Sequence, residues 1–200
     1  MKQALLLIDI QNDFLPGGAL AVPDGDAVIP VANRLISEFD FVVATQDWHP
    51  YSHGSFASRH HGQEPGEIIT LNGLDQVLWP DHCIEDTTGA ELADELEVEQ
   101  IEQIIYKGTD PGIDSYSGFF DNGHRKATGL HDLLQAHEIN DLTIVGLATD
   151  YCVKFTALDA RQLGYNVTVI TDGVRGVDLN PGDSERALEE MRAAGVTITD

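Results

Sequence analysis

Five residues suited to acid–base or nucleophilic chemistry each follow an apolar run of the sequence. They are three carboxylates, one lysine and one thiol: Asp9, Asp47, Lys107, Cys152 and Asp172. If the apolar runs are strands of an open α/β sheet, all five lie at one edge of it, where such sheets bind ligands. There Asp9 could accept the thiol proton of Cys152, and Lys107 could stabilise the thiolate. Taken singly, Asp9 is more simply explained as a turn residue and Lys107 as a solvated lysine, and we interpret Asp172 as part of an Asp-Gly turn.

The sequence around Cys152 predicts a buried strand, a short turn and then a helix. Residues 142–147 form an apolar run, and apolar residues recur at helical spacing over residues 153–163. Thr149 or Asp150 can cap this helix and so place Cys152 in its first turn. Free N–H groups and the helix dipole would there favour a thiolate and could hold an oxyanion. The alternative is a small buried cysteine that only fills space.

A second group of residues is suited to holding a metal ion. Five of the eight histidines lie in residues 46–90, and two of the candidates belong to an Asp-Trp-His segment. Carboxylate and imidazole ligands suit zinc, iron or manganese, and three protein ligands leave positions open for water or substrate. Surface histidines without a metal are the alternative. The candidates are Asp47, His49, His53, His60, His61 and His82.

Strands and helices alternate along the chain, which predicts a mostly parallel six-stranded sheet covered on both faces. We therefore expect a Rossmann-like, three-layer α/β/α fold in a single domain, residues 1–200, although G-x-G-x-x-G and P-loop segments are absent. Long loops are expected at residues 46–90 and 108–123, and a turn at residues 172–173. Strands are expected at residues 4–8, 41–45, 103–106, 142–147, 166–171 and 196–199, and helices at residues 26–39, 91–96, 128–137, 152–163 and 184–194.

The composition opposes several classes of function. A formal charge of -23 over 200 residues argues against binding to nucleic acid or to an anionic membrane surface. No stretch is apolar and long enough to span a membrane, and the start lacks the basic residues of a signal peptide. Cys83 and Cys152 do not make a disulfide framework, so we expect a reduced, cytoplasmic protein.

Seven segments resemble, in the same order, the motifs of the nicotinamidases (pyrazinamidases), which belong to the isochorismatase-like cysteine hydrolases. The resemblance runs from the first expected strand to the last. Its most specific features are D-x-H and W-P-x-H-C together with G-L-A-T-x-Y-C. The segments are DIQNDF at residues 9–14, PGGAL at 16–20, DWHP at 47–50, HGSF at 53–56, WPDHC at 79–83, SYSGF at 115–119 and GLATDYC at 146–152.

This resemblance implies roles for individual residues. It implies a catalytic triad of Asp9, Lys107 and Cys152, in agreement with the strand-end argument. It also implies a cis peptide bond between Leu147 and Ala148, and an oxyanion hole formed by the N–H groups of Ala148 and Cys152.

The resemblance further implies a metal and a substrate pocket. One divalent metal ion, zinc in first place with iron and manganese as alternatives, would be held by Asp47, His49 and His82. His53 is only a fourth candidate, because family members differ on whether the corresponding histidine is a ligand. Aromatic side chains would form the walls around a pyridine ring, although aromatics beside glycine-rich loops often only pack the loop down. They are Phe14, Trp79 and Tyr116.

The activity implied is hydrolysis of nicotinamide to nicotinate and ammonia for NAD salvage, with pyrazinamide as a further substrate. The expected partner is thus a small molecule, and a homo-oligomer is left open. An amidase for N-carbamoyl or ureido compounds and an isochorismate hydrolase are alternatives, but those relatives generally lack the Asp-x-His…His set. From other classes, the alternatives are a metal-binding or scaffold protein with an inactive site, and a thiol–disulfide role for Cys83 with Cys152.

Overall fold

The fold is organised around a six-stranded sheet in which all neighbouring strands are parallel. The computed structural model describes residues 2–200. β1 lies in the middle of the sheet, between β2 and β6, and most of it is buried, as expected for a strand covered on both faces. In spatial order the strands are β5 (Gln103–Lys107), β2 (Val42–Asp47), β1 (Lys2–Ile8), β6 (Ile139–Leu147), β7 (Asn166–Arg175) and β8 (Thr197–Thr199).

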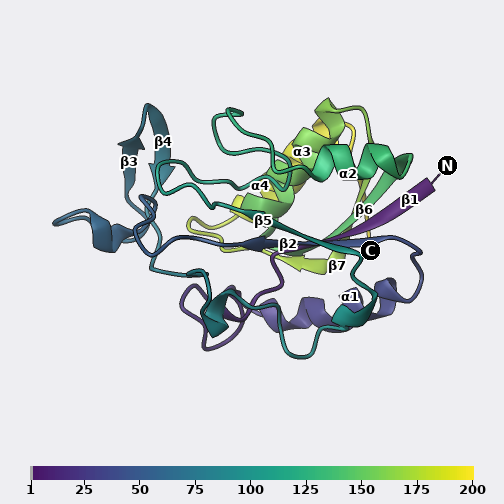
Figure 1. Cartoon of the computed structure of the whole chain (residues 1–200), viewed down its shortest axis with the longest axis horizontal. Coiled ribbons are helices and arrows are strands. Elements are labelled where there is room, and N and C mark those ends of the chain that lie inside the picture. The colour runs from purple at the N-terminus through teal and green to yellow at the C-terminus, as the bar shows by residue number, and fades with distance from the viewer. Residues whose placement is uncertain (1) are drawn as a thin grey trace.

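Helices cover both faces of this sheet, with α1 on one side and α2, α3 and α4 on the other (Figure 1). Successive residues of β1 point to opposite faces and so belong to two hydrophobic cores. Leu5 and Leu7 pack with the residues of α1, whereas Leu6 and Ile8 pack with those of the other three helices. The predicted three-layer α/β/α architecture is therefore confirmed. The helices are α1 (Val28–Ile36), α2 (Leu130–Ala136), α3 (Lys154–Gln162) and α4 (Asp183–Ala193).

A two-stranded hairpin projects beyond one end of the sheet (Figure 1), within residues 46–90, which we expected to be a loop. Its strands, β3 (Ile68–Leu71) and β4 (Leu74–Val77), pair antiparallel. Asn72 and Gly73 join them with φ angles of 48° and 87°. Positive φ at both central residues is typical of a two-residue hairpin turn, and Asn-Gly is its strongest sequence signal. The sequence therefore contained the information needed to predict this hairpin.

The helix expected at residues 91–96 is absent, so that prediction is wrong. The backbone of this segment bonds to the loop that follows β1 rather than to itself. The N–H of Ala93 donates to the carbonyl of Ile10 over 2.9 Å, and the N–H of Asn12 donates to the carbonyl of Glu91 over 3.0 Å. Only short 3₁₀ turns form on either side, at Thr88–Ala90 and Val98–Gln100.

Within residues 2–200, no helix has the length and apolar character needed to cross a membrane.

Candidate active site

Four of the five polar residues expected at the carboxyl edge of the sheet meet there. Asp9 follows β1, Asp47 and Lys107 are the last residues of β2 and β5, and Cys152 lies in the turn after β6. These four strands are consecutive neighbours in the sheet, and Asp47 is the register partner of Lys107. Parallel strands that end together thus bring a thiol, an amine and two carboxylates into one place.

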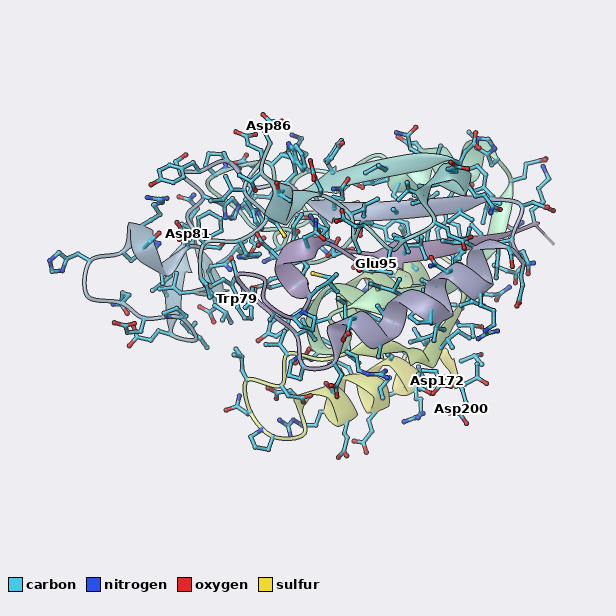
Figure 2. All side chains as sticks on the ribbon, turned by 90° about the horizontal axis from the view of Figure 1, so that it is seen from below. Trp79, Asp81, Asp86, Glu95, Asp172 and Asp200 are labelled. Atoms are coloured by element: carbon cyan, nitrogen blue, oxygen red, sulfur yellow. The ribbon has the colours of Figure 1, made fainter. Side chains whose placement is uncertain are left out.

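Asp172 does not join this group, so its expected place at the same edge is wrong. β7 does not turn at residues 172–173 but continues to Arg175, with a shift in its pairing to β6. The residues within that shift, Asp172 among them, lie before the end of the strand. Figure 2 shows Asp172 beside Asp200, at the end of the molecule away from Trp79.

Lys107 is at the centre of the group. Its Nζ lies 2.8 Å from Asp9 Oδ2, 3.0 Å from the carbonyl oxygen of Ser115 and 3.4 Å from the sulfur of Cys152, and it also donates to Asp47. Burial alone would lower the pKa of Lys107, but the carboxylates of Asp47 and Asp9 raise it well above its ordinary value. Lys107 is therefore a fixed positive charge between the carboxylates and the sulfur.

Asp9 and Cys152 are close enough for a proton to pass between them through small movements. A carboxylate oxygen of Asp9, one of Asp47 and the sulfur of Cys152 all lie within 4.8 Å of one another. The hydroxyl of Thr45 donates to Asp9 Oδ1 over 2.6 Å and fixes the carboxylate. Burial raises the pKa of the Cys152 thiol well above its ordinary value, and the charge of Lys107 only partly opposes this. Burial thus favours the neutral thiol over the thiolate, so attack would require a base such as Asp9.

Cys152 lies in a π-helical turn, Thr149–Val153, that precedes α3. The regular first turn expected here is absent, because the N–H groups of Tyr151 and Val153 both donate to the carbonyl of Ala148, each over 3.1 Å. The peptide bond before Ala148 is cis, as the family resemblance implied. Ala148 and Cys152 line the same pocket.

The side chain of Asp150 does not cap the helix, contrary to one of the two capping options we considered, and Thr149 does not cap it either. The Asp150 carboxylate instead accepts the backbone N–H groups of Val177 and Asp178, over 3.0 and 2.8 Å. It therefore ties the turn that carries the thiol to the segment after β7, which supplies Val177 to the wall of the pocket.

Three side chains beside this group, Asp47, His49 and His82, have ligand atoms within 4.8 Å of one another. His49 Nδ1 lies 2.9 Å from the carbonyl oxygen of Gly108, and His82 Nδ1 lies 2.7 Å from that of Pro80. These bonds leave Nε2 of each ring available to the site, and Nε2 of His49 is buried without a partner among residues 2–200. Burial lowers the pKa of both histidines to about 4, so both rings are neutral, the form that binds metals. The donor set fits a divalent metal ion.

His53 lies next to these ligands, with its ring centroid 4.3 Å from that of His49. Its Nδ1 is 2.7 Å from the hydroxyl of Ser55, and its buried Nε2 has no hydrogen-bond partner in the described part of the chain. Together with His49 and Asp114 it forms a second group with ligand atoms within 4.8 Å. The sequence did not reveal Asp114, because it lies in a loop and belongs to none of the motifs; only its burial identifies it.

The other two histidines of the 46–90 region lie outside the group. His60 Nε2 is 2.7 Å from the carbonyl oxygen of Gly54, and His61 is exposed. Behind the site, the fully buried ring of Phe56 lies 5.6 Å from each of the three site histidines, centroid to centroid. The histidines therefore stand against an apolar wall that keeps solvent from their far side.

A pocket lined by aromatic side chains adjoins both Cys152 and the histidines. The structure places the three expected aromatics, Phe14, Trp79 and Tyr116, on its walls, together with Tyr151, which we had not selected. The hydroxyl of Tyr116 accepts hydrogen bonds from Trp79 Nε1 and Gln76 Nε2, over 3.2 and 3.1 Å. One pocket thus has a thiol, two carboxylates, an imidazole and aromatic side chains on its walls, with Asp9, Lys107 and His49 directly beside them.

The comparison with protein families agrees with this site. The family model of the isochorismatase domain matches residues 3–200, and the chain therefore belongs to the isochorismatase family.

Within that family, several relatives that are similar over the whole chain are nicotinamidases or pyrazinamidases. The nicotinamidase of Escherichia coli K12 is 57% identical over 200 residues, which cover 98% of this chain and 93% of that protein. A solved structure of the yeast nicotinamidase, bound to the inhibitor nicotinaldehyde, is similar with a TM-score of 0.94 and 33% identity, covering 99% of each chain. A pyrazinamidase of Pyrococcus horikoshii, in complex with zinc, is similar with a TM-score of 0.81 and 40% identity, covering 99% of this chain and 98% of that one.

Proposed function

We propose that this protein hydrolyses nicotinamide to nicotinate and ammonia in NAD salvage, and that it also accepts pyrazinamide. The observation that carries the proposal is that Cys152, Asp47 and His82 line one pocket. Lys107 joins Cys152 to Asp9 beside it, and His49 lies with Asp47 and His82. The 57% identity to the Escherichia coli nicotinamidase supports the choice of substrate. Both cysteines are free and buried, which suits the reducing cytoplasm.

Substrate would be held by the metal-ligand set and the aromatic walls. Asp47, His49 and His82 would hold one divalent metal ion, zinc in first place with iron and manganese as alternatives, which supplies a Lewis-acid site for the ring nitrogen. His53 would be a fourth ligand. The rings of Phe14, Trp79 and Tyr116 would hold the pyridine ring flat, so that the carboxamide carbon lies against the sulfur.

Asp9, Lys107 and Cys152 would carry out the chemistry. Asp9 takes the thiol proton as the sulfur of Cys152 attacks the carboxamide carbon, and the N–H groups of Ala148 and Cys152 stabilise the oxyanion. The C–N bond breaks, ammonia leaves with the proton from Asp9, and a thioester remains. Water, deprotonated by Asp9, then hydrolyses the thioester and releases nicotinate. Lys107 balances the charge of Asp9 throughout.

Ammonia release from nicotinamide tests this proposal. The purified protein is assayed as isolated, after chelation, and after zinc, iron or manganese is returned. We expect chelation to abolish nicotinate formation and one of the metals to restore it. Activity that ignores chelation would overturn the role of the metal and keep the cysteine hydrolase. A folded, metal-loaded protein that releases no ammonia from nicotinamide would overturn the proposed substrate.

A further inference from the structure

The pocket beside Cys152 is much narrower than the space outside it. Its cavity volume is about 30 Å³. The walls of so narrow a pocket limit the size of the ring that can enter it.

A larger cavity, of about 450 Å³, lies directly outside this pocket. Tyr116 and Tyr151 are the two residues that line both spaces, and they form the partition between them. On the outer side, Phe155 stacks on Tyr116 with ring centroids 5.5 Å apart and keeps 37% of its surface exposed. Lys154 Nζ also lies over the Phe155 ring, 4.8 Å from its centre. The outer cavity therefore contains an aromatic ring that contacts a tyrosine and a cation and is still partly exposed.

The two tyrosines of the partition differ in how firmly they are held. Both are partly buried. Tyr116 is held by two hydrogen bonds to its hydroxyl, from Gln76 and Trp79. The hydroxyl of Tyr151 makes no hydrogen bond with any of residues 2–200, and its ring meets Trp79 and Tyr116 only edge-on, at 4.9 and 5.3 Å. Tyr151 can thus turn outward without breaking a hydrogen bond, whereas Tyr116 cannot.

Each of the two cations that line the outer cavity is paired with a carboxylate. Lys154 Nζ lies 3.3 Å from Glu190, and Arg186 is bonded to Asp183. Since no cation in this cavity is left without a carboxylate beside it, the cavity does not favour an anion. Its chemistry suits a neutral aromatic ring.

We propose that Tyr151 determines the substrate range: its ring limits the site to monocyclic aromatic carboxamides by separating the inner pocket from the outer cavity. Without that ring, the two spaces join, and a fused bicyclic amide such as quinoline-3-carboxamide can place its first ring beside Cys152 and its second against Phe155. This inference rests on the proposed hydrolysis of aromatic carboxamides.

The test compares kcat/KM for nicotinamide and quinoline-3-carboxamide in the wild-type protein and in Tyr151→Ala, Tyr151→Phe and Phe155→Ala. We expect Tyr151→Ala to shift the ratio toward the bicyclic amide by about tenfold or more, as pocket changes of this size do. Tyr151→Phe should keep the wild-type ratio, because it retains the ring and loses no hydrogen bond. Phe155→Ala should also keep it, because Phe155 does not line the inner pocket. An unchanged ratio in Tyr151→Ala, with nicotinamide still hydrolysed, overturns the inference.

A binding measurement separates this inference from the proposed function. Affinities of both amides are measured by calorimetry for Cys152→Ala and for Cys152→Ala/Tyr151→Ala, after each variant is shown to unfold cooperatively. A relative gain of about tenfold for the bicyclic amide in the double variant supports the role of Tyr151, even if the wild-type protein releases no ammonia. Equal affinity ratios in the two variants overturn it, whatever the outcome of the activity assay.

Discussion

The two halves of the candidate site are positioned in different ways. The strand half, Asp9, Asp47, Lys107 and Cys152, is placed by the ends of four neighbouring parallel strands. None of the residues of the other half, the loop half, lies in a strand. They are His49, His53, Trp79, His82, Asp114 and Tyr116. Hydrogen bonds from side chain to backbone, such as that of His49 with Gly108, orient them. The groups proposed to react, together with the candidate metal ligand Asp47, thus stand at the ends of strands, and the other groups that would recognise a ligand stand on loops.

One buried side chain fastens the two halves together. The amide of Gln11 donates to the carbonyl oxygens of Asp47 and Ala90, each over 2.8 Å, and accepts the N–H of Asp47 over 2.9 Å. Asp47 ends a strand, whereas Ala90 belongs to the loop region. Substitutions in the strand half should therefore have large effects on turnover and stability. A substitution at this junction should have a smaller effect, mainly on the loops.

The largest expected effect is on turnover. Cys152→Ala removes the proposed nucleophile, and we expect kcat for nicotinamide to fall by at least about a thousandfold while metal content stays the same. Ammonia release and metal analysis measure both. Cys83→Ala is the matched control, because Cys83 is also a free, buried thiol but does not line the pocket, and it should keep turnover. Near-wild-type activity in Cys152→Ala would remove the strand half from the chemistry.

The next effect is on stability. Lys107→Met leaves Asp9 and Asp47 buried without their shared cation, so the free energy of unfolding should fall by about 3–5 kcal/mol, and turnover should be lost. Urea unfolding gives the first value. Lys2→Met is the control, because Lys2 pairs with Glu138 at the surface and its loss should not change stability measurably. Equal stability of Lys107→Met and the wild-type protein would show that this ion group does not hold the strand half.

The smallest effect is expected at the junction. Gln11→Ala leaves the buried N–H of Asp47 unpaired and removes one of the two hydrogen bonds that the carbonyl of Ala90 accepts, the other coming from Gln46. It should lower the free energy of unfolding by about 1–3 kcal/mol. Hydrogen exchange should rise mainly around residues 79–90 and much less in β1 and β6. Asn12→Ala, which removes an exposed bond to Thr88, should change exchange less. Equal increases in the sheet and in the loops would mean that the halves are not separate units.

The sequence predicted the strand half better than the loop half, for a physical reason. An apolar run marks a buried parallel strand, and the residue after it must lie at the carboxyl edge of the sheet, so Asp9, Asp47 and Lys107 were located without a template. This rule failed at Asp172, because β7 continues past it to Arg175. The continuation depends on a shift in the pairing of β7 with β6, which we did not predict from the sequence. The density of histidines in residues 46–90 pointed to His82 but did not separate it from His60 and His61, and only the family motifs pointed to Trp79.

Some features of the loop half depend on contacts that no local pattern encodes. Asp114 becomes a candidate only because the fold buries it beside His49 and His53. The segment at residues 91–96 has a helix-like composition, yet its backbone bonds to residues 10–12, some 80 positions earlier. By contrast, the Asn72-Gly73 pair is a hairpin signal that the sequence itself contains. We did not predict the hairpin, because apolar and polar residues alternate only weakly in the strands on either side.

The central position of β1 has a consequence for synthesis on the ribosome. β1 pairs with β2 on one side, but its other partner, β6, begins about 90 residues after β2 ends. Because the ribosome adds about 5–20 residues per second, the second edge of β1 stays unpaired for roughly 5 to 20 seconds before β6 is made. During that interval the nascent chain exposes an unpaired strand that invites aggregation, and chaperones should be most needed then. Chains that stop before β6 would have neither a closed core nor Cys152.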